Sequence, residues 1–184
     1  MRILLVAEAP SIHTRRWAEY FRDRGADVHI ASFRPYEISG VKVYVLPRFG
    51  LGKLGYFFAL WSLPKLCTAL RPDVVHAHYV TSYGFLAALA GLRPLIVTAW
   101  GSDVLISPKK SIFLRYFARY AVMHAAVVTI LAEHMNKSVV ELGASPEKIV
   151  VTPFGVDTQL FAPVSPEAAT HAPQIGRASC RERV

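Results

Sequence analysis

The sequence predicts an α/β fold, a Rossmann-like parallel sheet with helices on both faces. Short runs rich in Val, Ile and Leu alternate with helical stretches along the chain. Each run is almost continuously apolar, which is typical of strands buried on both faces. The connections between runs are long enough for helices that cross over between parallel strands. The 184 residues suffice for one substantial domain of this class and are too few for two.

Seven strands are predicted in order along the chain. The first, residues 2–7, is apolar throughout after Arg2. The third, residues 41–46, alternates around Lys42 and Tyr44, as a half-buried strand does. The other predicted strands are residues 27–32, 73–77, 95–98, 126–129 and 149–151.

Five helices are predicted between these strands. The helix over 13–24 places Trp17 and Phe21 four residues apart on one face, and Gly25 is a suitable terminator. The helix over 54–70 is rich in aromatic residues and is expected to kink near Pro64. The remaining helices are predicted over residues 80–90, 112–122 and 132–142.

Composition indicates a folded domain with affinity for anions. Hydrophobic residues make up 53% and charged residues 18%, which excludes a disordered tail. The net charge of +8 favours a phosphate-bearing partner: a nucleotide, a nucleic acid or an anionic membrane surface. The two cysteines form neither a disulfide framework nor a spaced metal cluster. With no stretch long enough for a signal peptide or a membrane span, we expect a cytoplasmic protein, or one peripheral to the inner membrane face.

The chain is expected to divide into three parts. Residues 1–162 form the predicted domain, and the Ala- and Pro-rich residues 163–173 are interpreted as a linker or the start of a missing second domain. Residues 174–184 have no apolar periodicity and match one reading frame of a short-read sequencing adapter. We interpret them as an assembly artefact, with a natural basic tail as the alternative.

Ligands of open parallel sheets bind outside the carboxyl ends of the strands, so the residues that follow each strand are the candidates for function. After the first strand, Ser11 is a candidate N-cap for the next helix. Arg15 and Arg16 lie in the first turns of that helix, where positive charge is unfavourable unless an anion binds there. The alternative is that both arginines extend into solvent.

Two further strand ends carry candidate residues. His76 and His78 lie two apart and share a strand face, with His78 reaching into a cleft. The alternatives are a hydrogen-bonded pair of core imidazoles, or an incomplete metal site with Asp103 that lacks a fourth ligand. Gly101 indicates a positive φ or a close backbone approach. Asp103 either accepts a hydrogen bond from a sugar hydroxyl or caps the next turn.

The glycines of residues 50–55 match the spelling of a dinucleotide fingerprint, but they follow the third strand rather than the first. We interpret this segment as a flexible loop. Residues 48–61 combine basic and aromatic side chains, a mixture that favours a membrane interface. The alternative is an aromatic helix packed on the sheet, and both can hold at opposite ends of one helix.

Four motifs in register resemble the N-terminal domain of family 4 glycosyltransferases. They are Ser-Ile-His-Thr-Arg-Arg-Trp at 11–17, Asp-Val-Val-His-Ala-His at 73–78, Thr-Ala-Trp-Gly-Ser-Asp-Val at 98–104 and Val-Thr-Pro-Phe-Gly-Val-Asp-Thr-Gln-Leu-Phe at 151–161. The resemblance implies a GT-B architecture of two Rossmann-like domains that face each other across a cleft. It also implies sugar transfer from a nucleotide donor, with retention of anomeric configuration and without a metal or other cofactor.

The same resemblance implies roles for individual residues. The N-terminal half shapes the acceptor side, and residues 154–161 are the hinge into a donor-binding second domain. The substrate-binding set is Ser11, His13, Arg15, Arg16, His78, Trp100, Gly101, Asp103 and Glu133, with His78 and Asp103 as the candidates for catalysis. Two positions depart from the family. Pro10-Ser11-Ile12 stands in place of a Gly-Gly pair, and Trp100 replaces a histidine, so it can stack on a sugar but cannot relay a proton.

The predicted function is therefore that of a retaining glycosyltransferase whose acceptor is a glycan, a lipid or a cell-envelope precursor. Without its donor-binding domain the chain is expected to be inactive alone. One alternative is a sugar-nucleotide 2-epimerase, which relies on cleft carboxylates where this chain has His and Trp. The other is a non-enzymatic anion-binding module. Nucleic acid is not an expected partner, because the single basic-aromatic cluster is mostly apolar.

Overall fold

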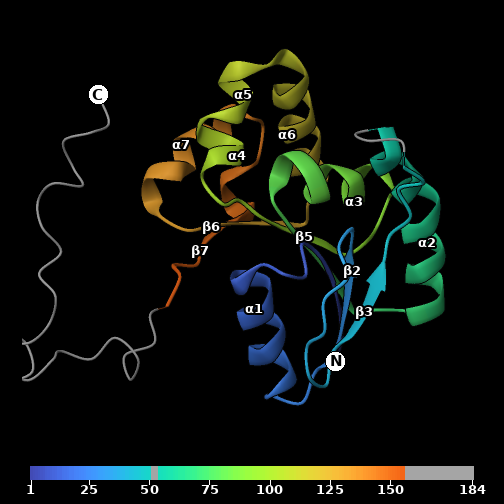
Figure 1. Ribbon diagram of the computed structural model, residues 1–184. Coiled ribbons are helices and arrows are strands. Elements are labelled where there is room, and N and C mark those ends of the chain that lie inside the picture. The colour runs from blue at the N-terminus through green and yellow to red at the C-terminus, as the bar shows by residue number, and fades with distance from the viewer. Residues whose placement is uncertain (51–53, 156–184) are drawn as a thin grey trace, which may run out of the picture. The chain divides into compact units, whose positions relative to one another are not determined.

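The computed structural model describes residues 1–50 and 54–155, and these form a sheet flanked by helices (Figure 1). Met1–Pro153 is one compact unit, and Phe154 begins a second. The predicted boundary at residue 162, the linker 163–173 and the tail 174–184 lie outside the described residues, as does most of the predicted hinge. The centre of the glycine-rich loop 50–55 also lies outside them.

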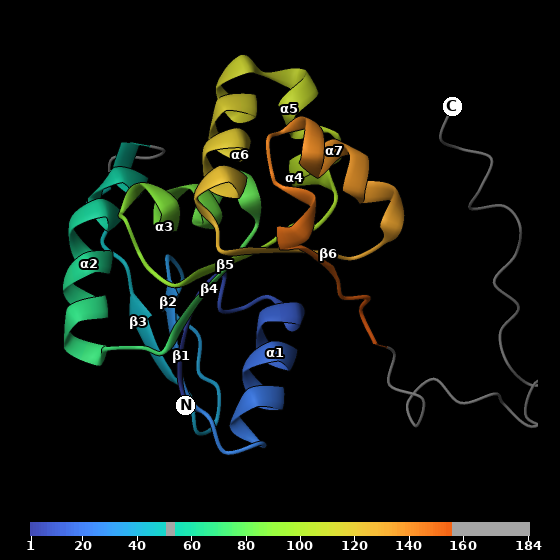
Figure 2. The same ribbon diagram turned by 180° about the vertical axis from the view of Figure 1, so that it is seen from behind.

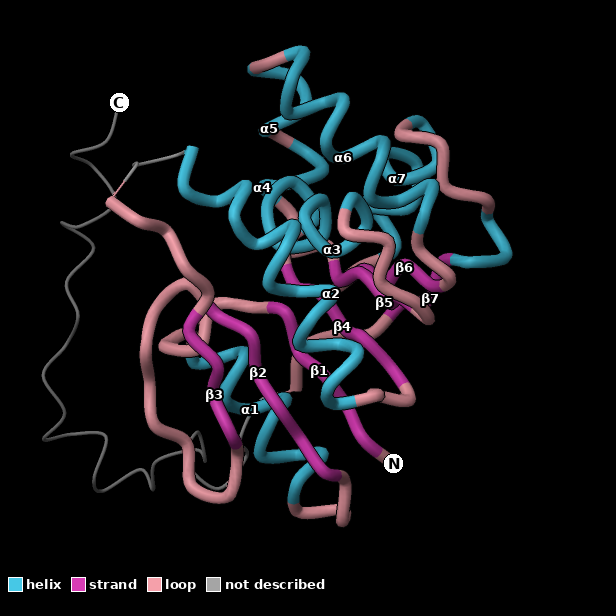
Figure 3. Tube along the Cα trace, turned by 90° about the vertical axis from the view of Figure 1, so that its right-hand side faces the viewer, coloured by secondary structure: helices cyan, strands magenta, loops and turns pink. Residues whose placement is uncertain are grey.

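All seven strands of the described residues belong to one parallel sheet, which confirms the predicted fold class. Their order is β3-β2-β1-β4-β5-β6-β7 (Figure 3). The chain therefore moves outward from β1 and returns to β4 at its other side, which makes the β1–β4 boundary a topological switch point. The strands are β1 (Arg2–Val6), β2 (Asp27–Ser32), β3 (Lys42–Val45), β4 (Val74–His78), β5 (Leu95–Thr98), β6 (Val127–Ile130) and β7 (Ile149–Val151).

Helices cover both faces of the sheet (Figures 1 and 2). Alternate residues of β1 enter different cores: Ile3 and Leu5 pack with α1, whereas Leu4 and Val6 belong to the larger core under α2, α3 and α6. The α-helices are α1 (Ile12–Arg22), α2 (Ala59–Leu70), α3 (Phe85–Leu89), α4 (Ser102–Leu105), α5 (Ser107–Lys110), α6 (Ile112–His124) and α7 (Asn136–Glu141). None of the described helices is long and apolar enough to span a bilayer.

Three predicted helices begin differently from a regular α-helix. Residues 54–70 start as the 3₁₀ helix η1 (Leu54–Phe58), residues 80–90 as the π-helical turn η2 (Val80–Gly84), and residues 132–142 as the 3₁₀ helix η3 (Glu133–Met135). In η2 a Cβ added to Gly84 would lie 2.9 Å from Val97 Cγ1, so the turn packs directly on β5. The helices α4 and α5 and the 3₁₀ helix η4 (Pro146–Lys148) were not predicted, because elements this short carry no hydrophobic period.

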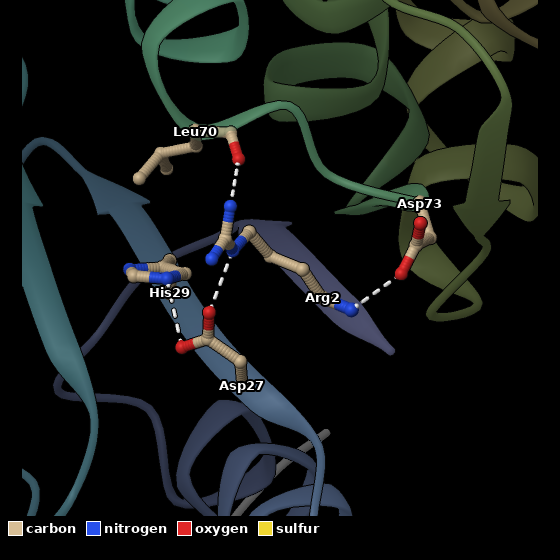
Figure 4. A network of polar contacts seen from close by, with 5 residues as sticks. All are labelled: Arg2, Asp27, His29, Leu70 and Asp73. Atoms are coloured by element: carbon tan, nitrogen blue, oxygen red, sulfur yellow. Dashed lines mark hydrogen bonds and ion pairs between the residues drawn. The ribbon is translucent and has the colours of Figure 1, made fainter.

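The amino edge of the sheet is joined by a network around Arg2 (Figure 4). The Arg2 guanidinium donates to Asp27 at 2.6 Å and to the Leu70 carbonyl, and the Arg2 backbone N–H donates to Asp73 at 2.6 Å. Asp27 also lies 3.0 Å from His29 Nε2. This network connects β1, β2, the end of α2 and the approach to β4 through exposed side chains.

Candidate functional site

The carboxyl ends of β1, β4 and β5 bring four predicted site residues together. His13 lies in the first turn of α1, His78 ends β4, and Trp100 and Asp103 follow β5. The Trp100 ring lies 4.7 Å from the His13 ring and 5.5 Å from the His78 ring, between centroids. Three residues from distant parts of the sequence therefore form one aromatic cluster at the switch point of the sheet.

Trp17 and His76 complete this cluster and were missing from the predicted set. The Trp17 ring meets His76 edge-on at 4.9 Å and His78 at 5.8 Å, and the two histidine rings lie 4.7 Å apart. The spacing of each residue from a predicted site residue in the sequence could have identified it. Trp17 follows His13 by four residues on the same helix face, and His76 shares its strand face with His78. We call His13, Trp17, His76, His78 and Trp100 the carboxyl-edge cluster.

A buried polar chain anchors the inner end of the cluster. His76 Nε2 lies 2.6 Å from Thr98 Oγ1, which lies 2.6 Å from Thr129 Oγ1, so the chain crosses β4, β5 and β6. Burial lowers the pKa of His76 to about 4, and the imidazole is therefore neutral near pH 7. The hydrogen bond of His76 goes to Thr98, so the pair of histidines is in edge contact rather than bonded to each other.

His78 is only 2% exposed and lies behind the partly exposed His13 and Trp100. Burial holds the pKa of His78 well below its usual value, and the neighbouring His76 and His13 lower it further. Within the described residues neither ring nitrogen of His78 has a hydrogen-bond partner. A neutral imidazole has one donor and one acceptor, so His78 retains the capacity to bind one group of each kind.

Asp103 joins two loops of the site and is fully buried. Its Oδ2 accepts the Val80 backbone N–H at 2.7 Å, and its Oδ1 accepts the Trp100 backbone N–H at 2.9 Å. Burial raises the pKa of Asp103, and the backbone N–H groups oppose that effect. This geometry corresponds to the capping alternative for Asp103, in which the carboxylate fixes the loops after β4 and β5.

The backbone of these loops is unusual at two positions. Gly101, directly after Trp100, has φ +104°, which confirms the expectation of a positive φ there. Tyr79, directly after His78, has φ +71° and places its hydroxyl 2.9 Å from Ser102 Oγ. This second tie between the same loops was not predicted, because a positive φ at a tyrosine has no signature in the sequence.

The remaining predicted residues lie outside the cluster. Ser11 occupies the N-cap position of α1, but its side chain makes no capping hydrogen bond. Arg15 donates to the Tyr36 hydroxyl at 3.2 Å and lies over that ring, while Arg16 is exposed. Glu133 is exposed at the start of η3, and in the described part of the chain no hydrogen bond, ion pair or ring contact links it to the cluster.

Among residues 1–50 and 54–155, no three His, Cys, Asp or Glu side chains come together as a metal site. A hollow along the connection from β2 to β3 is lined by residues 36–39 and 41–43, which include none of the predicted site residues. The independence from a metal stays a prediction, and the carboxyl-edge cluster is the candidate site.

Several solved structures share the fold of this chain. HepE from Anabaena, in complex with UDP-glucose, has a TM-score of 0.69 and 21% identity over 93% of this chain and 48% of that protein. Sucrose-phosphate synthase from Thermosynechococcus elongatus has a TM-score of 0.69 and 13% identity over 94% and 53%. UDP-GlcNAc 2-epimerase from Neisseria meningitidis, bound to UDP-GlcNAc, has a TM-score of 0.62 and 15% identity over 83% and 46%.

These likenesses concern the fold, and the chain spans about half the length of the structures it matches. No match was found among curated proteins. The family model described as "Glycosyl transferase 4-like" matches residues 2–132, which hold three of the four motifs and the whole carboxyl-edge cluster. The resemblance seen in the sequence is thereby confirmed, and the chain belongs to the glycosyl transferase 4-like family.

Proposed function

We propose that this chain forms the acceptor-side wall of the cleft in a retaining glycosyltransferase that uses a nucleotide-sugar donor. The observation that carries the proposal is the contact of Trp100 with both His13 and His78 at the switch point of the sheet. A second, donor-binding domain supplies the opposite wall. The family assignment and the fold shared with HepE support this reading.

The exposed and buried members of the cluster take different roles in this proposal. Trp100 and His13 are partly exposed, so they are the surfaces available to a substrate. The Trp100 ring suits the apolar face of a sugar, and His13 lies beside it to hydrogen-bond a hydroxyl. His78 lies behind them with a neutral ring, and Asp103 holds the Trp100 loop; we assign both as positioning residues.

The chemistry of a retaining transfer places its main demand on the leaving phosphate, which must be stabilised as charge develops. Arg16 is exposed in the first turns of α1 and is the free candidate for this role, since Arg15 already contacts Tyr36. We propose no metal or other cofactor, and the nucleotide sugar is a co-substrate. HepE binds UDP-glucose, which makes a UDP-linked hexose the first donor to test.

We further propose a glycan, lipid or cell-envelope precursor as the acceptor, used at the cytoplasmic side of a membrane. Phe49 and Trp61 of the segment 48–61 are 69% and 65% exposed, whereas Tyr56 packs on Phe33 with 4.4 Å between ring centroids. The aromatic segment therefore packs through Tyr56 and exposes Phe49 and Trp61, and its contact with a membrane stays a prediction.

A 2-epimerase is the alternative enzyme, because epimerases share this fold. Acid–base epimerisation needs carboxylates free to exchange protons. Here Asp103 is buried under two backbone N–H groups, and Glu8 accepts the Tyr83 hydroxyl at 2.8 Å. These engagements favour the transferase. In protein that carries the second domain, the anomeric configuration of a transferred sugar, read by NMR, tests retention.

Binding to the chain itself tests the site. UDP-glucose is titrated while the indole N–H and imidazole signals are followed by NMR. We expect shifts at Trp100 and His13 and none at Trp61 or His134, and Trp100→Ala should weaken binding at least about tenfold while Trp61→Ala leaves it unchanged. UDP alone lacks the sugar ring and should not shift Trp100. Equal effects of UDP and UDP-glucose at Trp100 would instead support an anion-binding module.

A further inference from the structure

The connection between β5 and β6 exposes a patch of large apolar side chains. We call residues 106–116, the end of the α4 turn, α5 and the first turns of α6, the α5–α6 tip. Ile112 and Phe113 are 74% and 71% exposed, and Ile106 and Tyr116 are 49% and 58% exposed. Single exposed apolar residues are ordinary, but four within eleven residues form a patch that needs an explanation.

The part of this connection that follows Asp103 carries only positive charge. Between Asp103 and Glu133 the sequence contains no acidic residue, whereas it contains Lys109, Lys110, Arg115 and Arg119. Lys109 and Lys110 end α5, are exposed and, in the described part of the chain, form no ion pair. A bilayer with anionic headgroups has an apolar interior beneath a negatively charged surface. Apolar side chains flanked by unpaired cations complement both layers.

The tip lies toward the carboxyl ends of the strands, on the face of the sheet opposite α1. The helix α6 leads back to the start of β6, so its first residues lie toward the carboxyl ends of the parallel strands. In Figures 1 and 2, α5 and the start of α6 project at the top, beyond the other elements of the described chain. A flat surface can therefore reach the tip without obstruction by the sheet.

We propose that the α5–α6 tip docks on the surface of an anionic lipid bilayer. Ile112 and Phe113 enter the interface while Lys109 and Lys110 bind headgroup phosphates. This inference stands apart from the proposed function, because lipid binding is measured without sugar transfer. It also assigns the membrane contact to a different segment from 48–61, in which the described cation, Arg48, lies over the Tyr56 ring.

Vesicle flotation of the chain tests the proposal. Vesicles of phosphatidylcholine with about a third phosphatidylglycerol should bind the chain, and pure phosphatidylcholine vesicles should bind it at least about tenfold more weakly. The pair Lys109→Glu and Lys110→Glu, and separately the pair Ile112→Ser and Phe113→Ser, should each reduce binding to anionic vesicles at least about tenfold. These side chains are exposed, so circular dichroism should show unchanged folding.

Matched controls change the same chemistry at other places. Arg24→Glu with Lys65→Glu, and Tyr20→Ser on the exposed side of α1, should leave vesicle binding within about twofold. Failure to bind anionic vesicles overturns the proposal. Normal vesicle binding by both tip variants also overturns the proposal. This includes the result in which the pair Phe49→Ser and Trp61→Ser abolishes vesicle binding while both tip variants keep it. A concentration-dependent dimer that the tip variants dissociate, without vesicle binding, would make the patch a contact between copies of the chain.

Discussion

The polar residues at the two edges of the sheet differ in their exposure, their charge and their partners. At the amino edge, Arg2, Asp27 and Asp73 are charged, exposed and each paired with a neighbour (Figure 4). At the carboxyl edge, His76 and His78 are buried and neutral, and the buried Asp103 is held by backbone N–H groups. Charge in water needs little support, whereas a polar group out of water needs a defined partner for each atom.

The two edges therefore differ in what their polar groups do. Exposed pairs at the amino edge only satisfy each other's charge, whereas buried groups at the carboxyl edge hold loops in a defined arrangement. At the amino edge, ion pairs form between side chains at the strand ends, and the charged groups stay in contact with solvent. The carboxyl edge accepts a positive φ at Tyr79 and an imidazole without hydrogen-bond partners at His78, among the described residues. A strained backbone and a buried polar ring without partners both cost free energy. They persist only where the surrounding structure holds them in place, and they are found mainly at binding sites.

The largest effect expected from this comparison is that of removing the Asp103 carboxylate. Asp103→Ala removes the acceptor of the buried Val80 N–H and of the part-buried Trp100 N–H, and should lower the free energy of unfolding by about 3 kcal/mol. Asp73 is the matched control, because it also accepts a backbone N–H but is exposed. Asp73→Ala should cost less than about 1 kcal/mol. Urea denaturation measures both, and equal losses would remove the distinction between the edges.

The sequence predicted those features that depend on short apolar runs. The bounds of β2, β5 and β7 agree with prediction to the residue. The four-residue helices α4 and α5 were missed, since elements this short carry no hydrophobic period, and α5 consists of Ser-Pro-Lys-Lys.

The sequence predicted only those features of the candidate site that follow from the topology of the sheet. Residues that follow strand ends must gather at one edge of a parallel sheet, which placed His13, His78 and Trp100 together. The partner of Asp103 could not be predicted in this way. The Val80 N–H comes from another loop and directly follows Tyr79, whose φ of +71° has no signature in the sequence. Arg15 and Glu133 also follow strand ends, but Arg15 contacts Tyr36 and Glu133 is exposed.

An intermediate effect is expected from pH. The pKa of His76 falls from 6.5 to about 4 on folding, so the unfolded chain binds more protons between these values, and stability falls as pH falls through this window. From pH 7.5 to pH 5.5, His76 should account for a loss of about 1.3 kcal/mol. His76→Gln removes this share and keeps a group that can hydrogen-bond Thr98. Urea denaturation of both proteins at the two pH values measures it; an unchanged pH dependence would mean that His76 is not buried in neutral form.

The smallest effect is expected at the amino edge, where Arg2→Met removes the guanidinium that binds Asp27 and the Leu70 carbonyl. Both side chains of the ion pair are about half exposed, so water replaces the lost partner, and the melting temperature should fall by about 2 °C or less. Because the pKa of Asp27 is lowered chiefly by its hydrogen bond with Arg2, the variant should raise that pKa, which NMR titration measures. High salt should remove what remains of the difference in melting temperature, since exposed pairs are screened. A loss as large as that of Asp103→Ala would show that the two edges differ in exposure but not in their contribution to stability.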